Sequence, residues 1–188
     1  MKSDEIREMA DEDIISLIIS SHTNKYFEEI YKRYYHKVFE KCLGLVKNRN
    51  TAQELAEDIF SKVLEKMNGF RRMSSFSSWL YSITYNHCID YLRAKKNLHY
   101  PSWNQENQIP EILDESEDAQ YDISYEKLEI ILDLIHPEEK ALLLMKYKDN
   151  LSIKQISNAL RISDDAAKMR LKRARTRVLY MYKQKFLS

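Results

Sequence analysis

Glycine and proline are scarce in this chain, which has two glycines and three prolines among 188 residues. Average proteins contain about 12% of the two together. Phosphate-binding loops and dinucleotide fingerprints need several glycines within a few residues, and no such window exists here. All-β sandwiches and barrels need many turns with positive φ, so the shortage argues against them as well. We therefore expect an all-α chain built from long helices with few breaks.

Charge is distributed unevenly along the chain, although the formal net charge is only +1. Residues 102–126 hold eight acids and no lysine or arginine, whereas residues 161–188 hold nine bases against two acids. The acidic stretch also holds a proline, lies directly after another, and shows no sustained apolar period, which is typical of a linker. The sequence therefore predicts two small helical domains joined by an acidic flexible linker. The predicted boundaries are an acidic N-terminal segment at 1–19, a first domain at 20–98, the linker at 99–122 and a second domain at 123–188.

Apolar residues recur at helical spacing throughout the first domain. One series runs from Phe27 to Leu45, and a second repeats every fourth residue from Leu55 to Met67. Asn50 gives a start signal for the second of these helices. A third helix is expected from about Ser77 to Lys96. Its predicted core residues are Trp79, Leu80, Ile83 and Tyr91.

The second domain contains two short helices joined by a tight turn. Ser152 and Gln155 form a predicted capping box, and Ser163 can cap the next helix after a turn at Arg161 and Ile162. The inward face of that next helix is predicted to carry Ala167, Leu171, Ala174 and Val178. Its outward face is predicted to carry Asp165, Lys168, Met169, Lys172 and Arg173. This pattern indicates a helix-turn-helix whose long side chains reach base edges and phosphates in a major groove, the alternative being a solvated charged face on an ordinary helix pair.

Cysteine usage and the N-terminal sequence indicate where such a chain would work. Cys42 and Cys88 cannot form a CxxC site or a disulfide framework. The first residues are acidic where a signal peptide would be basic, and the longest apolar stretch there is short and interrupted by Ser16. We expect a reduced, cytoplasmic protein with no cofactor, no metal and no direct membrane insertion.

Both domains resemble the extracytoplasmic-function (ECF) group of sigma-70 family factors of bacterial RNA polymerase. The second domain resembles their promoter-reading domain in the run HPEEKALLLMKYKDNLSIKQISNALRISDDAAKMRLKRAR. The first resembles their polymerase-binding and minus-10-reading domain in the runs FEEIYKRYYHKVF, ELAEDIFSKVLEKM and FSSWLYSITYNHCIDYLR. Two departures are Arg161, where the family usually has glycine, and the run DDAA at 164–167, where it favours small, neutral and β-branched residues. The resemblance implies a sigma factor that directs promoter-specific transcription initiation and is not an enzyme.

The resemblance also implies which surfaces bind the partners. The surface implied for docking on core RNA polymerase consists of Glu54, Glu57, Asp58 and Phe60. The implied minus-10 DNA surface, a polar stripe on the third helix with two arginines before it, consists of Arg71, Arg72, Ser82, Asn86, Asp90, Arg93 and Asn97. The implied minus-35 DNA surface consists of Lys168, Met169, Arg170, Lys172, Arg173, Arg175 and Arg177. The linker would thread through the polymerase, and an anti-sigma factor, often membrane-anchored, would be an inhibitory partner.

Three other functions remain open from the residues. Glu54, Asp58 and His87 could form a hydrolytic metal site, since carboxylates and imidazoles suit divalent metals. Residues 152–178 could serve a stand-alone transcriptional regulator that binds duplex DNA without polymerase. A sigma-like antagonist would bind polymerase yet start no transcripts.

Overall fold

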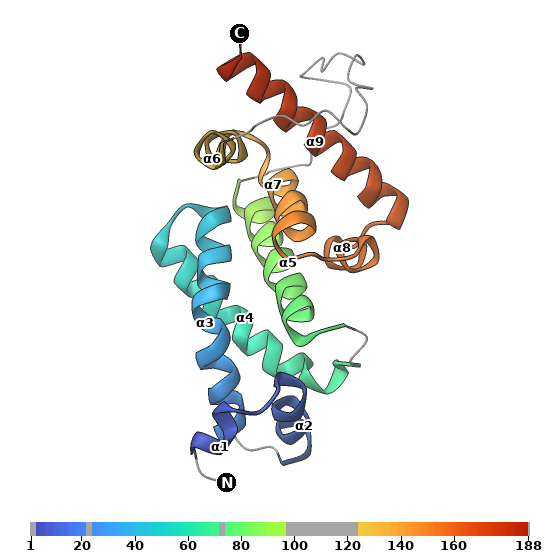
Figure 1. The fold of residues 1–188 in the computed structure, drawn as a ribbon. Coiled ribbons are helices and arrows are strands. Elements are labelled where there is room, and N and C mark those ends of the chain that lie inside the picture. Colours follow the sequence, from blue (N-terminus) through green and yellow to red (C-terminus); the bar gives the residue numbers. More distant parts are fainter. Residues whose placement is uncertain (1–2, 22–23, 72–73, 97–123, 188) are drawn as a thin grey trace. The chain divides into compact units, whose positions relative to one another are not determined.

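The computed structural model describes residues 3–21, 24–71, 74–96 and 124–187, and these residues form helices with no strand among them (Figure 1). The chain divides into two compact units, Met1–Ala94 and Lys95–Ser188. The predicted all-α fold with two helical domains is confirmed. The predicted linker at 99–122 lies outside the described residues. Within the described part of the chain, no helix is both long enough and apolar enough to span a membrane.

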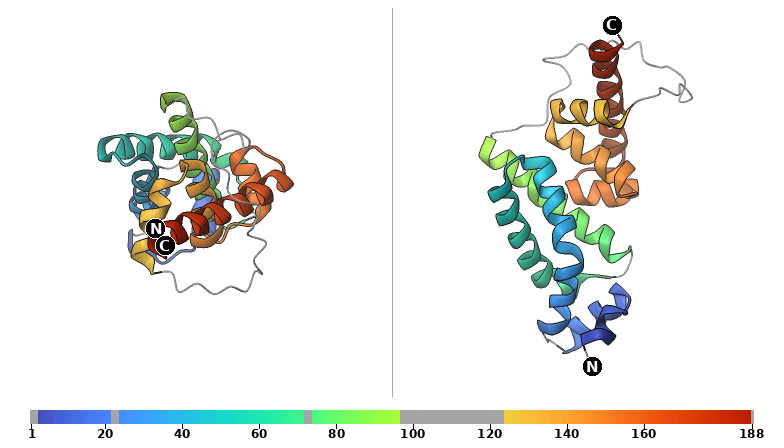
Figure 2. Two further views of the ribbon diagram at one scale, coloured as in Figure 1. Left: turned by 90° about the horizontal axis from the view of Figure 1, so that it is seen from above. Right: turned by 60° about the vertical axis from the view of Figure 1, so that its left-hand side comes forward.

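The first unit is a bundle in which α3 and α4 pack against each other and α5 lies beside them (Figures 1 and 2). Its elements are α1 (Ser3–Arg7), α2 (Asp11–Ser21), α3 (Asn24–Val46), α4 (Arg49–Lys66), the 3-10 turn η1 (Met67–Gly69) and α5 (Phe76–Lys96). The buried side chains include Ile30, Val38 and Leu45 from α3, Leu55, Ile59 and Val63 from α4, and Phe76, Leu80, Tyr85 and Leu92 from α5. The apolar series predicted for the first two long helices therefore does face the core.

Two details of this unit differ from the sequence prediction. The cap of α4 is Asn48 and not Asn50, because the extended backbone at Asn48 lets its side chain accept a hydrogen bond of 2.9 Å from the Thr51 amide. In α5, Leu80 is buried as predicted, but Trp79 and Ile83 are only half-buried. Trp79 lies against the rings of Phe70 and Phe76 at centroid distances of 5.2 and 5.8 Å. The buried face of α5 is thus rotated from the one predicted; Tyr91 is half-buried as well.

Residues 1–19, set apart as an acidic segment in the sequence analysis, belong to the first compact unit. Helix α2 buries Ile14, Ile15 and Ile18 and packs on α3. Asp11, its first residue, ties the helix to α3, because it accepts hydrogen bonds from Arg33 and from the Tyr34 hydroxyl. Burial and the neighbouring Asp11 carboxylate raise the pKa of Tyr34.

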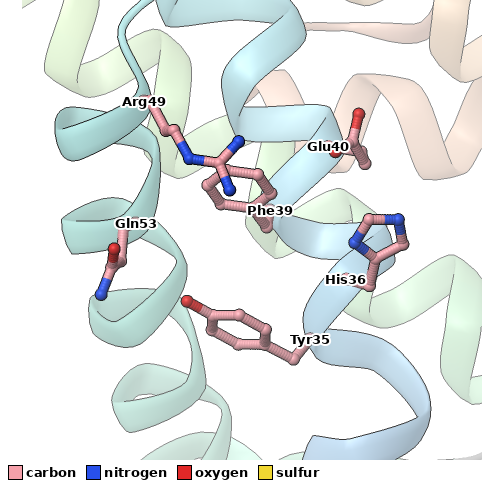
Figure 3. Close-up of a pocket in the computed structure, with 6 residues that line it drawn as sticks. All are labelled: Tyr35, His36, Phe39, Glu40, Arg49 and Gln53. Atoms are coloured by element: carbon pink, nitrogen blue, oxygen red, sulfur yellow. The ribbon is translucent and has the colours of Figure 1, made fainter.

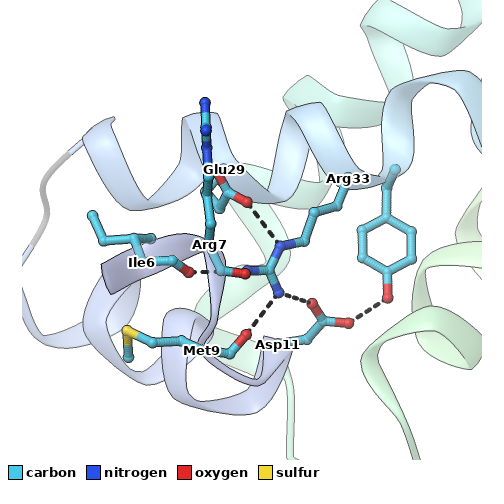
Figure 4. A network of polar contacts seen from close by, with 7 residues as sticks. Ile6, Arg7, Met9, Asp11, Glu29 and Arg33 are labelled. Carbon is cyan, nitrogen blue, oxygen red and sulfur yellow. Dashed lines mark hydrogen bonds and ion pairs between the residues drawn. The ribbon is translucent and has the colours of Figure 1, made fainter. Parts of the chain in front are cut away.

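Arg33 joins the N-terminal helices to α3 (Figure 4). Its guanidinium donates to the backbone carbonyls of Ile6, Arg7 and Met9 at 2.8–3.0 Å. It also donates to Asp11 at 2.9 Å and to Glu29 at 3.0 Å. We call Arg33 and these five acceptors the Arg33 cluster. The carbonyls lie at the end of α1 and in the connection to α2, where helix geometry leaves them without an intrahelical partner.

The second unit contains α6 (Tyr125–Leu134), α7 (Pro137–Leu143), the π-helical turn η2 (Leu144–Lys148), α8 (Ile153–Leu160) and α9 (Asp164–Phe186). Helix α9 carries most of the packing, because α6, α7 and α8 all lie against it. Its buried side chains are Ala167, Leu171, Ala174, Val178 and Tyr182. The inward face predicted for this helix is therefore confirmed.

Two neighbouring glutamates of α7 lie in the interior of the second unit. The side chains of Glu138 and Glu139 are each 1% exposed and each binds an arginine of α9: Glu138 binds Arg170, and Glu139 binds Arg177 Nε at 3.0 Å. The second carboxylate oxygen of Glu139 has no hydrogen-bond partner among the described residues. Burial raises the pKa of Glu139, and the Arg177 charge opposes that shift without cancelling it. We call these two pairs the α7–α9 ion pairs.

Among the described residues, three other than glycine adopt the left-handed backbone conformation: Lys47, Asn150 and Arg161, with φ of 58°, 54° and 55°. Glycine is the usual residue at such positions, because a side chain there costs about 1 kcal/mol. Lys47 follows α3, Asn150 follows η2, and Arg161 ends α8. The chain therefore contains left-handed positions despite its few glycines, and residues with side chains occupy them.

Replacing Arg33 by methionine (Arg33→Met) should release α1 and α2 from α3, because five acceptors lose their bond to the guanidinium. We expect the free energy of unfolding to fall by about 2–4 kcal/mol and the amides of α2 to exchange faster with deuterium. The control is Lys32→Met, which removes an ion pair with Glu28 whose side chains are 58% and 62% exposed and should cost less than about 0.5 kcal/mol. Equal losses from the two variants would contradict the role of Arg33.

Arg177→Met should leave the Glu139 carboxylate buried without its cation. We expect a loss of about 3–5 kcal/mol in the second unit, measured as faster hydrogen exchange in α7 and α9. Because the pKa of Glu139 is already raised and rises further without Arg177, the folded state takes up the proton first, so the loss should shrink from about pH 7 to pH 5. Adding Glu139→Gln should recover much of the loss, and Arg175→Met is the exposed control. A pH-independent loss would contradict this account.

Candidate functional site

The turn between α8 and α9 has the geometry of a helix-turn-helix. The Ser152 amide donates to Gln155 Oε1 at 2.8 Å and the Gln155 amide donates to Ser152 Oγ at 3.2 Å, which confirms the predicted capping box. Ser163 caps α9 by accepting from the Ala166 amide at 3.1 Å. Arg161 takes the left-handed position between the two helices. In addition, the Ser157 hydroxyl of α8 donates to the Asp164 carboxylate of α9, so a side chain also bridges the turn.

The outer face of α9 is exposed and mainly basic. Met169 is 49% exposed, and Lys172 and Arg175 are exposed as well. Lys168 lies 3.2 Å from Asp165 in an exposed ion pair, which water and salt weaken. Arg173, four residues after Met169 on the same face, is half-buried. Such a face presents cations for phosphates together with an apolar side chain that can contact bases.

Arg170 and Arg177 lie on another side of α9. Both guanidiniums are held in the α7–α9 ion pairs, and their side chains are 24% and 15% exposed. These arginines bind buried glutamates and position α9 within the unit, and their assignment to DNA stays a prediction.

The polar stripe of α5 remains accessible where the structure describes it. Ser82, Asn86, Asp90 and Arg93 are half-buried, and Asp90 lies 3.7 Å from Arg93. The Ser82 hydroxyl donates to the Ser78 carbonyl at 2.9 Å, which leaves its lone pairs available. Arg71 is exposed. Of the residues predicted for the same surface, Arg72 and Asn97 lie outside the described residues.

Helix α4 carries the three acids predicted to bind polymerase. Glu54, Glu57 and Asp58 are exposed, and Glu57 accepts a hydrogen bond of 3.2 Å from the Gln53 amide. Phe60, predicted with them, is 2% exposed. Its ring packs among the α3 rings of Phe27, Tyr31 and Tyr35 at centroid distances of 6.3, 4.8 and 6.2 Å. Phe60 is therefore a core residue, and its assignment to the docking surface is corrected.

His87 of α5 forms a structural contact with α4. His87 Nδ1 lies 2.7 Å from Lys62 Nζ, and His87 Nε2 lies 3.8 Å from Asp58 Oδ2. Burial, followed by the Lys62 charge, lowers the pKa of His87, which therefore favours the neutral ring. The described residues contain no group of three or more histidine, cysteine and acidic side chains that could hold a metal ion. A cationic lysine at the Nδ1 atom also makes this a poor metal site.

A pocket of about 230 Å³ between α3 and α4 was not found from the sequence (Figure 3). Its lining residues are Tyr35, His36, Phe39, Glu40, Arg49 and Gln53. The Arg49 guanidinium lies over the Phe39 ring at 5.3 Å from the centroid. Because Gln53 also contacts Glu57, the pocket adjoins the acidic face of α4. The sequence did contain a signal for this pocket, because Tyr35 and Phe39 each directly follow a member of the apolar series predicted for α3.

Family models match both units. Residues 30–98 match Sigma-70 region 2, and residues 126–178 match Sigma-70, region 4. The ECF RNA polymerase sigma factor SigW of Bacillus subtilis is 28% identical over 160 residues, which cover 79% of this chain and 84% of the relative. SigM of the same organism is 25% identical over 155 residues, covering 82% and 94% of the two chains. SigX, also from that organism, is 22% identical over 147 residues, covering 76% of each.

Solved structures share the fold. CnrH, solved in complex with the cytosolic domain of CnrY, has a TM-score of 0.61 and 14% identity, covering 94% of this chain and 99% of that one. The sigma factor RpoE of Bartonella quintana, solved in complex with the anti-sigma factor NepR, has a TM-score of 0.57 and 15% identity, covering 86% and 99%. Two family regions in this order, over a helical bundle and a helix-turn-helix, show that the chain belongs to the ECF group of the sigma-70 family of bacterial RNA polymerase sigma factors.

Proposed function

We propose that this sigma factor docks on core RNA polymerase through the acids of α4, reads the minus-10 element with α5 and reads the minus-35 element with α9. The observation that carries the proposal is the outer face of α9, which is the second helix of the helix-turn-helix. This face exposes the apolar side chain of Met169 together with several cations. As a family member, the chain is a transcription initiation factor that directs promoter-specific initiation and is not an enzyme.

On α9, we assign contact with the minus-35 major groove to Lys168, Met169, Lys172 and Arg173. Met169 lies opposite the buried row, and Lys172 and Arg173 follow on the next turn. Arg175 is turned about 60° from Lys172 towards the buried side, so its guanidinium suits a phosphate beside the groove. Arg170 and Arg177 are left out of this surface, because their guanidiniums bind Glu138 and Glu139.

In the first unit, the exposed acids of α4 suit a basic partner surface, where charges of opposite sign guide orientation and speed association. The α5 stripe offers an amide, a carboxylate and a guanidinium in a row, which can hydrogen-bond bases and backbone of a melted strand. Arg71 lies before α5 and can reach a phosphate. Arg72 and Asn97 stay in the proposal on the sequence alone.

An inhibitory partner is also proposed. The similar solved proteins include a sigma factor in complex with the anti-sigma factor NepR and CnrH in complex with the cytosolic domain of CnrY. By analogy, we propose that an anti-sigma factor, whether membrane-anchored or not, binds this chain in the cytoplasm.

Run-off transcription with bacterial core polymerase on a genomic fragment library tests the function. With the protein present, we expect new transcript 5′ ends that share two spaced upstream elements. Binding to core without new starts would favour a sigma-like antagonist. Specific duplex binding with no binding to core would favour a stand-alone regulator.

A charge reversal on α4 tests the docking surface in the same assay. Glu54→Lys with Glu57→Lys should weaken core binding about tenfold or more, with a strong dependence on salt. The matched control is Glu126→Lys with Glu129→Lys, another pair of exposed acids three residues apart on one helix, in the second unit. Equal weakening by both pairs would point to net charge and not to the α4 surface.

Two substitutions on α9 separate base reading from phosphate binding. Lys172→Ala should relax the preference at one position of the minus-35 element by about 1–3 kcal/mol. Arg175→Ala should weaken binding to all sequences alike and lower the salt dependence by about one phosphate contact. Both are measured by fluorescence anisotropy against a panel of minus-35 variants over a salt series. Indistinguishable profiles would contradict the division.

A further inference from the structure

The chain's two cysteines meet in the core of the first unit. Cys42 of α3 and Cys88 of α5 are separated by 46 positions, and both are fully buried. The Cys88 thiol donates to Cys42 Sγ at 3.5 Å. None of the surfaces described above uses either residue. Two cysteines on different helices are thus in direct sulfur–sulfur contact.

This contact is close to what a disulfide needs. The sulfur atoms of a disulfide are about 2.05 Å apart, so the pair must close by about 1.5 Å. Closing that distance requires both side chains to rotate and α3 and α5 to approach each other.

The folded state protects the thiols from rapid oxidation. The thiolate is the reactive form, and the hydrogen bond to Cys42 together with burial raises the pKa of Cys88 well above its usual value. Oxidant therefore reaches the pair when α5 opens locally or before the unit has folded. Once formed, the bond would be shielded from reductants in the same way.

We propose that Cys42 and Cys88 are an oxidation site at which a peroxide closes an intramolecular disulfide that ties α5 to α3. The first thiol loses its proton, and its thiolate attacks one oxygen of hydrogen peroxide. The O–O bond breaks, a sulfenic acid forms, and the hydroxide that leaves takes up the proton to become water. The second thiol attacks that sulfur, the S–O bond breaks and water leaves. In total, two thiols lose two hydrogen atoms, and the peroxide is reduced to two molecules of water.

The bond would stabilise the unit without covering the stripe on α5. Asn86 and Asp90 lie two residues on either side of Cys88, which turns them about 160° away from it on a helix. The cross-link joins the opposite side of α5 to α3. It also closes a loop across 46 positions, which restricts the unfolded chain.

The test treats the reduced full-length protein with hydrogen peroxide, with and without urea near the unfolding midpoint, followed by alkylation and peptide mass spectrometry. We expect a Cys42–Cys88 cross-linked peptide lighter by two hydrogens, formed faster in urea. The urea midpoint of the first unit should rise by about 1–2 M over the reduced sample. Cys42→Ser and Cys88→Ser are the matched controls and should show no rise.

Three outcomes would overturn the proposal: no cross-link under either condition, conversion of the cysteines to sulfinic acids in its place, or a cross-link that lowers the midpoint. These readouts do not depend on the function proposed above. A separate arm does: oxidised protein should keep run-off activity within about twofold of the reduced protein, and a larger loss would show that the bond disturbs the α5 stripe.

Discussion

Arginine side chains that bind acceptors inside the fold determine how the helices of each unit are placed. A guanidinium has five donors in a rigid plane, so one side chain can satisfy several acceptors that would otherwise be costly to bury. In the first unit, Arg33 satisfies carbonyls at the end of a short helix. In the second, Arg170 and Arg177 neutralise two adjacent glutamates that are almost fully removed from water. Losing any of these guanidiniums leaves acceptors without that hydrogen-bond donor. Because hydrogen bonds also depend on direction, these contacts fix the orientation of the helices as well as stabilising them.

The same arrangement sorts the basic residues of α9 by task. Arg170 and Arg177 lie seven residues apart and hold the helix at two points, which restricts both sliding and rotation. Lys172 and Arg175 then project from a helix whose orientation is set. The number of bases in the C-terminal segment therefore overstates the charge available to DNA, because the α7–α9 ion pairs neutralise part of it.

Local features were predictable from the sequence and long-range ones were not. The Ser152–Gln155 capping box, the cap at Ser163 and the buried row of α9 follow from residues within one or two turns. The burial of Phe60 and the ion pairs of Arg170 and Arg177 were not predicted, because their surroundings are set by distant residues; the partners of the two arginines are 32 and 38 positions away. The role of Arg33 was not predicted either. Its N-terminal acceptors are distant in the sequence, and three of them are backbone carbonyls, which a pattern of side chains cannot indicate. The resemblance to a family supplied the partners, which spacing alone could not identify.

The Arg33 cluster also has a consequence for the order in which the chain is made. Helices α1 and α2 leave the ribosome before α3, yet with 5 and 11 residues they are too short to be stable alone. Their anchor lies 22 to 27 positions later in the chain. We therefore expect α1 and α2 to stay unfolded until α3 has emerged, and to be among the later parts of the first unit to acquire their structure during synthesis.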